Sequence, residues 1–350
     1  MTAHSSLDPV YSTIQRLLIG FGLLFNVILM NLIIFRSPKD LGLYKHLMVY
    51  ILCFELFYIV LEFLSVPDLL TLDYSFFIIV DPEKSLLPRS WSQVADLIYC
   101  GAFAVSLVIF GCQFAYRYHV MKGNRSWTAS TFKNYVFWLG TPVVLASFYS
   151  YFVHAFMQRN DFSKKIMRSV GYSDDQIEAV GFIGLIFYPK LDNGTQIVNW
   201  QSFIGVSVTT GTLFFSEFTM IYFAYHCFQA TKSFINQANC STKLRRLQWQ
   251  LFYALVTQAI IPILFMQVPM TCIYTSTIVL RRAVPAIGHL QSMTISIYLA
   301  IDALPTILII KPYRDTIIKT VWFWRKQKIG PYHTNSSNSK QAHLSMTTNF

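Results

Sequence analysis

Charged side chains inside long apolar stretches are the residues of this sequence with the most potential for chemistry, because a charge there is costly unless it has a partner or a function. Five acids meet that description: Glu55, Glu62, Asp96, Glu217 and Asp302. At the helical rise per residue, Glu55 and Asp302 come to the same depth as Asn26, about 13–15 Å from the basic end of their stretches. We predict that Asn26, Glu55 and Asp302 form one buried polar cluster. Two roles are open for it: side chains that only satisfy one another and hold helices together, or a switch, ion site or proton site.

The other three acids come to different depths. Glu62 and Asp96 lie near the outer ends of their stretches, where we expect solvated charges at the rim rather than ligand contacts. Glu217 is nearer the middle of its stretch and is predicted to face Gln258. For Glu217 and Gln258, hydrogen bonding within the core and contact with a ligand are equally compatible with the sequence.

A single arginine, Arg117, lies near the end of the apolar stretch from Val94 to Tyr118. A terminal arginine of this kind often only extends its charged end to the lipid headgroups. It is also the kind of residue with which a receptor contacts the cytoplasm. Both interpretations apply to Arg117 on this stretch alone.

Composition indicates which elements position these side chains. Hydrophobic residues make up 54% of the 350 residues and charged residues 13%, whereas soluble domains have about 25% charged residues. Seven apolar segments are long enough for a helix to cross a hydrocarbon layer of about 30 Å. They lie at about 17–35, 46–65, 94–116, 135–156, 201–228, 251–279 and 287–310. We predict an all-α membrane protein, a seven-transmembrane helix bundle without a separate soluble domain.

The lysine and arginine counts indicate the orientation, because cytoplasmic loops carry the excess of positive charge. With the N-terminus outside, the inner loops and the C-terminal segment carry 18 such residues and the outer segments carry 10. The inner set includes Lys243, Arg245 and Arg246, which we expect in the third inner loop. Anionic lipid of the inner leaflet accounts for this charge as a partner, so no nucleic acid is needed.

The outer loops carry signals of their own. A β-prone run at 74–80 is predicted as a short ordered excursion in the first outer loop. In the second outer loop, Ser173 or Asp174 is predicted to cap a short helix. The sequon at Asn193 predicts glycosylation in the same loop. No cysteine lies in this loop, which excludes a disulfide between it and the third helix.

The last two spans and the C-terminal segment complete the expected domain. Pro262 and Pro269 are predicted to break the sixth span. An amphipathic helix is predicted at about 313–325, at the end of a membrane domain of 1–325. The remaining 326–350 are polar and are predicted to form a disordered cytoplasmic tail.

The sequence carries no signature of an enzyme. The motifs H-E-x-x-H and G-x-S-x-G, a P-loop, and paired cysteine and histidine spacing are all missing. We therefore predict that the protein is not an enzyme and has no cofactor and no metal site.

Several motifs in order resemble a known family. They are SPKDLGLYKHLMVY, FAYRYHVM, GYSDDQIEAVGFIGLIFY, LRRLQWQLFYALVTQAIIPILFMQVP and YLAIDALPTILIIKPYR. Together they are similar to the nematode Str-type serpentine chemoreceptors, which have close Srj relatives. The similarity extends over about residues 15 to 320.

The resemblance implies a G-protein-coupled chemosensory (olfactory) receptor of the plasma membrane, in the cilia of sensory neurons. Its implied ligand is a small, volatile or apolar odorant, which we expect in an aromatic-lined pocket in the outer half, enclosed by spans 3, 5, 6 and 7 and the second outer loop. Its implied partner is a heterotrimeric G protein, contacted by Arg117 and Tyr118. We expect ligand to move the sixth helix away from Arg117 and open a groove bordered by Lys243, Arg245 and Arg246.

Two positions depart from related patterns. In the seventh span, two residues separate Asp302 from Pro305, where the family leads us to expect a proline directly after the acid. Tyr116 precedes Arg117 where rhodopsin-type receptors have an acid. A partner that holds Arg117 in the resting state must therefore come from another helix.

Two other functions remain open from the sequence. A seven-helix, ligand-gated cation channel of the insect odorant-receptor kind has its N-terminus inside, which the basic-residue count opposes. A secondary transporter would show paired broken helices in repeated halves, and no such repeat is found.

Overall fold

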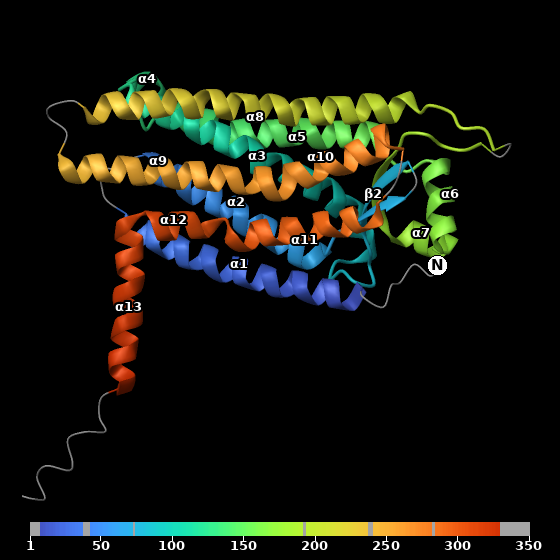
Figure 1. Cartoon of the computed structure of the whole chain (residues 1–350), viewed down its shortest axis with the longest axis horizontal. Helices are drawn as coiled ribbons and strands as arrows, with labels where there is room; N and C mark the ends of the chain where they lie inside the picture. The colour runs from blue at the N-terminus through green and yellow to red at the C-terminus, as the bar shows by residue number, and fades with distance from the viewer. Residues whose placement is uncertain are drawn as a thin grey trace, which may run out of the picture.

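The computed structural model describes residues 8–37, 43–72, 74–191, 194–236, 241–281 and 284–329. Within these residues, seven helices are long and apolar enough to cross a membrane. The first five are α1 (Asp8–Arg36), α2 (Leu43–Ser65), α3 (Ser92–Met121), α5 (Phe132–Phe156) and α8 (Trp200–Ile235). The sixth span consists of α9 (Thr242–Pro262), η3 (Ile263–Gln267), α10 (Val268–Tyr274) and η4 (Thr275–Val279), and the seventh of α11 (Pro285–Ile301) and α12 (Ala303–Ile309). They lie side by side along one axis (Figure 1), which confirms the predicted seven-helix bundle.

The third helix, α3, is the centre of the bundle. It packs against α2, α5, α8 and α9, and most of its side chains are buried. Small residues allow these close approaches, as in other membrane helices. At Gly101, for example, an added Cβ would lie only 2.5 Å from the Ser150 hydroxyl of α5.

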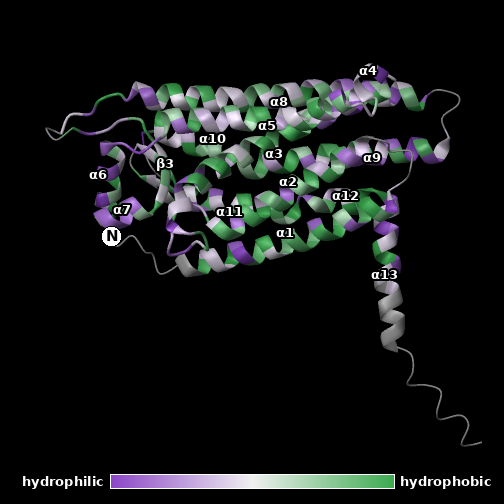
Figure 2. Ribbon diagram, turned by 180° about the vertical axis from the view of Figure 1, so that it is seen from behind, coloured by the Kyte–Doolittle hydropathy of each residue, from purple (hydrophilic) through white to green (hydrophobic). Residues whose placement is uncertain are grey.

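Large apolar side chains also cover the outward faces of the bundle. On α8, Phe215 and Phe218 are 73% and 69% exposed. Figure 2 shows hydrophobic residues along the parallel helices and hydrophilic residues gathered at the ends, notably on α6 (Asp161–Val170) and α7 (Asp174–Ala179). An apolar exterior of this extent suits a lipid environment, and the chain is a multi-pass membrane protein.

A three-stranded antiparallel sheet closes the outer end of the bundle. Its order is β1 (Asp68–Leu72), β2 (Ser75–Val80), β3 (Gly181–Ile186), so it joins the first outer loop to the second. Strand β2 confirms the predicted β-prone run, whereas β3 was not predicted. The sheet is an addition to the all-α class expected from the sequence.

Both faces of the sheet are buried. Alternate side chains of a strand point to opposite faces, and here Phe76 and Ile78 pack into the bundle while Phe77 and Ile79 pack under α6 and α7. This is why every residue of β2 is buried. The strand β3 begins at Gly181, where an added Cβ would lie 2.4 Å from the Ser92 carbonyl carbon of α3. The sheet is therefore a layer between the helical bundle and an outer pair of short helices.

The second of those short helices, α7, is the helix predicted from the sequence. Ser173 is its N-cap: the Ser173 hydroxyl accepts from the Gln176 amide at 3.3 Å, and the Gln176 side chain accepts from the Ser173 amide at 3.0 Å. This reciprocal pair is a capping box. Asn160 caps α6 in the same way with Ser163. Two further short elements are η2 (Arg89–Trp91) and α4 (Arg125–Thr128).

The sixth span is continuous, but its hydrogen bonding changes along its length from α-helical to π-helical. Pro262 has no N–H to donate within the helix, and the π-helical η3 follows it directly. A second π-helical segment, η4, ends the span. The two prolines therefore do not break the helix as predicted, but the α-helical hydrogen bonding changes at η3.

At the inner end, the sixth span begins earlier than predicted. The Ser241 hydroxyl accepts from the Leu244 amide at 3.2 Å and caps α9, whose first residue is Thr242. Lys243, Arg245 and Arg246 therefore lie on the first turns of a helix, and their predicted place in a loop is wrong.

The helix after the seventh span, α13 (Lys311–Ile329), runs at a steep angle to the bundle (Figure 1). Tyr313 is buried, and its hydroxyl lies 2.6 Å from that of Ser37 at the end of α1. The burial of Tyr313 and the hydrogen bond from Ser37 have opposite effects, and burial raises the pKa of Tyr313 to about 12. The helix extends past the predicted boundary at 325 to Ile329. The rest of the predicted tail lies outside the described residues.

Candidate functional site

One face of α2 carries three buried polar side chains. Glu55, Tyr58 and Glu62 are spaced three and four residues apart, which places them on one side of a helix. They are 2%, 0% and 0% exposed. The prediction that Glu62 is a solvated rim charge is therefore wrong. Only the tertiary fold packs β1 and β2 against the outer end of this helix.

Glu62 belongs to what we name the outer polar cluster: Tyr58, Glu62, Tyr99 and Ser296. The Ser296 hydroxyl of α11 donates to Glu62 Oε1 at 2.9 Å. The rings of Tyr58 and Tyr99 meet edge to face with centroids 5.5 Å apart. Among the described residues, the hydroxyls of both tyrosines and Glu62 Oε2 have no hydrogen-bond partner although all three atoms are buried. Tyr58, Tyr99 and Ser296 were not predicted as site residues from the sequence. For Tyr58, the signal in the sequence is its spacing between two acids on one helix face.

The inner polar cluster comprises Glu55, Gln258, Asp302 and Thr306, all buried. Gln258 Nε2 donates to the Asp302 carbonyl at 3.1 Å, and the Thr306 hydroxyl donates to Gln258 Oε1 at 2.8 Å. The carboxyl groups of Glu55 and Asp302 lie close enough to interact electrostatically. The cluster thus joins the second, sixth and seventh spans.

The break between α11 and α12 explains why Gln258 binds there. Pro305 cannot donate to the Ile301 carbonyl four residues earlier, so regular helical bonding is interrupted around Asp302. Gln258 supplies a donor to the neighbouring carbonyl of Asp302. The unusual spacing of Asp302 and Pro305 thus leaves the acid at the helix break.

Two sequence-based predictions about this region are wrong. Asn26 is buried, but its amide donates to the Gly22 carbonyl within α1 at 3.0 Å, and no hydrogen bond joins it to Glu55 or Asp302 in the part of the chain described. Gln258 binds the seventh span and does not pair with Glu217. Glu217 is half-buried on α8, and its Oε1 has no partner among the described residues. Sequence depth cannot give rotation about the helix axis, which decides these contacts.

Tyr298 connects the two clusters. It is 1% exposed on α11 and lies close enough to Glu55 and Asp302 of the inner cluster and to Tyr58 of the outer cluster to interact with them electrostatically. Polar side chains therefore continue through an otherwise apolar core from the outer half towards the inner half.

Arg117 is buried and bonded, not extended to lipid. Helix α3 continues to Met121, so Arg117 lies inside the helix and is only 2% exposed. Its Nη2 donates to Gln248 Oε1 at 3.0 Å and also to the Gln248 main-chain carbonyl. Its guanidinium carbon lies 5.7 Å from the centre of the Tyr44 ring. The third helix is thus tied to the sixth and the second at the inner face.

The other residues predicted for the inner face surround this contact. Tyr118 is half-buried and packs against Phe223 of α8, with ring centroids 6.1 Å apart. Lys243 and Arg246 line a groove of about 500 Å³ between α9 and α13, which Lys311 and Asp315 also line. Arg245 is exposed beside this groove. The remaining predicted residue, Asn193, lies outside the described residues.

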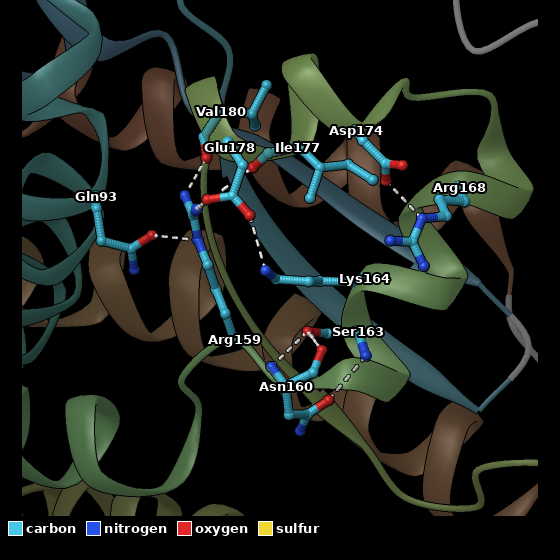
Figure 3. Close-up of polar contacts among 10 residues, drawn as sticks. All are labelled: Gln93, Arg159, Asn160, Ser163, Lys164, Arg168, Asp174, Ile177, Glu178 and Val180. Carbon is cyan, nitrogen blue, oxygen red and sulfur yellow. Dashed lines mark hydrogen bonds and ion pairs between the residues drawn. The ribbon is translucent and has the colours of Figure 1, made fainter.

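At the outer face, Arg159 joins the second outer loop to α3 (Figure 3). Its Nε donates to Gln93 Oε1 of α3 at 2.9 Å, and its Nη1 donates to the Ile177 carbonyl of α7 at 3.3 Å. Its Nη2 donates to the Val180 carbonyl, and its guanidinium carbon lies 4.7 Å from the centre of the Phe182 ring of β3. The described cysteines are all free, so Arg159 makes the connection that a disulfide would otherwise make.

Two acids lie near Arg159. Glu178 Oε2 is 4.0 Å from Arg159, and its Oε1 accepts from Lys164 at 2.7 Å. The hydrogen bond from Lys164 holds the pKa of Glu178 below its ordinary value. Burial lowers the pKa of Arg159, and the charges of Glu178 and Asp96 oppose that shift.

The prediction that Asp96 is a solvated charge at the rim of the bundle is also wrong. It is 0% exposed, and both of its carboxylate oxygens lack a hydrogen-bond partner within the described ranges. Arg159 is close enough to interact with it electrostatically. The loop above α3 covers Asp96, and only the tertiary fold places that loop there.

Comparison with known proteins agrees with this architecture. Residues 11–318 match the family described as "Serpentine type 7TM GPCR chemoreceptor Str". The chain is 29% identical to "G-protein coupled receptor str-217" of Caenorhabditis elegans over 88% of this chain and 89% of that protein. It is 27% identical to "Serpentine receptor class r-10" of the same species, over 86% and 88% of the two chains. The fold is similar to squid rhodopsin, with a TM-score of 0.55 and 10% identity over 90% of this chain and 86% of that one.

Replacement of Arg159 by alanine should loosen the second outer loop. Hydrogen bonds to a charged group are worth about 1.5–3 kcal/mol each, so amide exchange in α6 and α7 should accelerate at least about tenfold. Hydrogen–deuterium exchange of the purified protein measures this.

The matched control is Arg168→Ala. Arg168 pairs with Asp174 at 2.6 Å inside the same loop, and both side chains are exposed, so α7 should stay attached to α3. Equal acceleration in both variants would contradict the role of Arg159.

Proposed function

Since this chain belongs to the Str family of serpentine G-protein-coupled chemoreceptors, we propose that it binds a small, mostly apolar odorant in its outer half and activates a heterotrimeric G protein at its inner face. The observation that carries the inner part of this proposal is the buried contact between Arg117 and Gln248. It closes the inner end of the bundle between the third and sixth spans, where a G protein would have to insert.

The resting state is held by that contact. When the sixth span moves outward, Arg117 loses Gln248 and becomes available to the G protein, with Tyr118 beside it. The turn at Pro262 and η3 lies between the outer half and Gln248, and serves as the hinge. The groove lined by Lys243 and Arg246 then widens, because both residues move with α9.

The inner polar cluster connects ligand to this motion. Gln258 holds α9 to the seventh span through Asp302 and Thr306. An outward movement of α9 must break or re-pair these hydrogen bonds. The cluster therefore acts as the switch between the outer half and the Arg117 contact.

The proposed function also includes the cellular location, the glycosylation and the extent of the receptor domain. The receptor resides in the plasma membrane of sensory cilia, with its basic inner residues on anionic lipid. Asn193 carries a glycan on the outer side, and 1–325 form the receptor domain. The protein has no catalytic role.

Arg117→Ala should abolish ligand-stimulated G-protein activation while leaving the amount of receptor at the cell surface unchanged, because the guanidinium is the proposed coupling group. Surface labelling and a G-protein dissociation assay in the same cells measure the two quantities. Arg125→Ala is the control, because Arg125 is exposed on α4. Normal coupling by the Arg117 variant would refute the assignment.

Gln248→Ala should raise activity without ligand, because it removes one acceptor of the resting contact but keeps Arg117. A hydrogen bond to a charged group contributes about 1.5–3 kcal/mol, which corresponds to a rise of about tenfold in the active population. Gln248→Glu keeps an acceptor at the same position and should lower basal activity. A basal signal that is the same in both variants would contradict the lock.

Asp302→Asn should reduce ligand-stimulated signalling several-fold, since the amide removes the ionisable group with which the Glu55 carboxyl interacts. Asp161→Asn, at an exposed acid of α6, is the control and should signal normally. Full signalling by Asp302→Asn would leave the cluster with a purely structural role.

In the same assay, ionic current that persists with G proteins blocked would favour a channel.

A further inference from the structure

The outer half of the bundle contains an unusual concentration of buried acceptor atoms without donors. Glu62 Oε2, Gln267 Oε1 and Gln291 Oε1 have no hydrogen-bond partner in the described parts of the chain. Their side chains belong to residues that are 0%, 6% and 0% exposed. Folded proteins leave few buried polar atoms unpaired, and each one costs about 1–3 kcal/mol.

One helix, α11, contacts the surroundings of all three acceptors. Gln291 Nε2 donates to the Met266 carbonyl at 3.2 Å, which places Gln291 beside Gln267. On the same helix, α11, Ser296 donates to Glu62 at 2.9 Å. The region thus joins α2, α11 and the π-helical η3 just beneath the sheet.

The chemistry of the unpaired atoms indicates which ligand group could pair with them. Because the Met266 carbonyl can only accept, the group that Gln291 presents to it is the NH₂, and its oxygen is left as an acceptor. Glu62 has no ion pair with a basic side chain in the described ranges. The hydroxyls of Tyr58 and Tyr99 make no hydrogen bond of ordinary geometry, although Tyr99 lies close enough to Glu62 to interact with it. The rings of both tyrosines offer faces that attract cations. Several acceptors, one carboxyl and two aromatic rings suit a small group that carries several N–H donors.

We propose that the outer polar cluster, with Gln267 and Gln291, recognises the protonated amino group of a small ligand. This inference rests on the proposed function and names the polar end of the odorant. The ammonium donates to Glu62 and to the amide oxygens of Gln267 and Gln291. The apolar remainder of the ligand packs against the aromatic side chains of the surrounding core.

The same geometry explains how such a ligand acts on the sixth span. Gln267 is the last residue of η3, and π-helical turns often occur at functional sites. A donor held between Glu62 of α2 and Gln267 of η3 draws the hinge region towards the second helix. The outer polar cluster therefore biases the hinge.

The outer surface limits the size of the ligand. A cavity of about 20 Å³ opens between α1, β1 and α11, and Ser292 lies in its lining. One turn further along α11, Ser296 is bonded to Glu62. Asp68 of β1 and His289 of α11, whose side chains are 3.1 Å apart, hold the sheet against α11 at this cavity. Passage of a ligand requires this part of the sheet to shift, which favours small molecules.

The experiment uses the purified full-length receptor in lipid nanodiscs and measures thermal unfolding against added probe. The probes are straight-chain alkylamines of four to six carbons, with the alcohol and the 2-ketone of each chain length as neutral partners. Amines should raise the unfolding temperature saturably, and the neutral partners should bind at least tenfold more weakly.

Three variants test the assignment. Glu62→Gln removes the charge at constant size and should weaken amine binding about 30-fold or more. Tyr99→Phe removes one hydroxyl, keeps the ring, and should weaken it several-fold, which keeps the test valid if Glu62→Gln fails to fold. Asp161→Asn, at an exposed acid of α6, should bind amines as the wild type does.

The outcomes separate this inference from the proposed function. Failure of every amine to bind, equal binding of amine and neutral partner, or unchanged binding by both Glu62→Gln and Tyr99→Phe would overturn the inference. Glu62-dependent amine binding without G-protein activation in cells would support the inference and contradict the proposed function. Activation in cells by neutral odorants alone, unaffected by Glu62→Gln, would do the reverse.

Discussion

Lipid offers no hydrogen-bonding partner, so a polar group in a membrane-spanning bundle has to be satisfied by the protein or kept for a ligand. This constraint orients the helices here. Glu55, Tyr58 and Glu62 share one face of α2, so α2 must turn that face towards α3 and the seventh span. On the seventh span, Asp302 lies close to Glu55 and Ser296 donates a hydrogen bond to Glu62. The polar core therefore holds the relative rotation of three helices, and the apolar surface is left for lipid.

At the outer end of the bundle, the sheet separates buried polar side chains from water. It buries both faces, one on the bundle and one under α6 and α7, and so encloses side chains that would otherwise meet water. Glu62 and Asp96 are buried for this reason. The loop is held by non-covalent contacts at Arg159 and by the pairing of β2 with β3. Non-covalent closure can open reversibly, which a covalent cross-link would restrict, and this suits a site that has to admit a ligand.

At the inner end, the contact between Arg117 and Gln248 depends on where the sixth span stands. The π-helical η3 lies between that contact and the outer polar cluster, and Gln258 ties the helix to the seventh span one turn before Pro262. A movement at the outer side of η3 is therefore transmitted to Gln248 through a helix that is restrained at one intermediate point. In the proposed mechanism, this helix has two arrangements, one with Gln258 paired as here and one without, which would provide the bistable element of a receptor.

The sequence by itself determined the properties that depend on neighbours along the chain. Hydropathy specified the seven spans, phenylalanine and isoleucine content specified β2, and Ser173 and Asp174 specified the start of a capped helix. The depth of Glu55 and Asp302 followed from a constant helical rise. These are local quantities, so no knowledge of tertiary contacts was needed.

Only the tertiary structure decided which side chains meet. The side-chain conformation of Asn26 directs its amide to the Gly22 carbonyl of its own helix, and rotation of the sixth span about its axis turns Gln258 to the seventh span instead of Glu217. The partner of Arg117 is 131 residues away in the sequence, and the cover over Glu62 and Asp96 comes from loops that pair with each other. Such contacts depend on the packing of segments that are far apart in the sequence. The helical rise gives the depth of a residue along its helix, but it does not give which distant segment covers that residue.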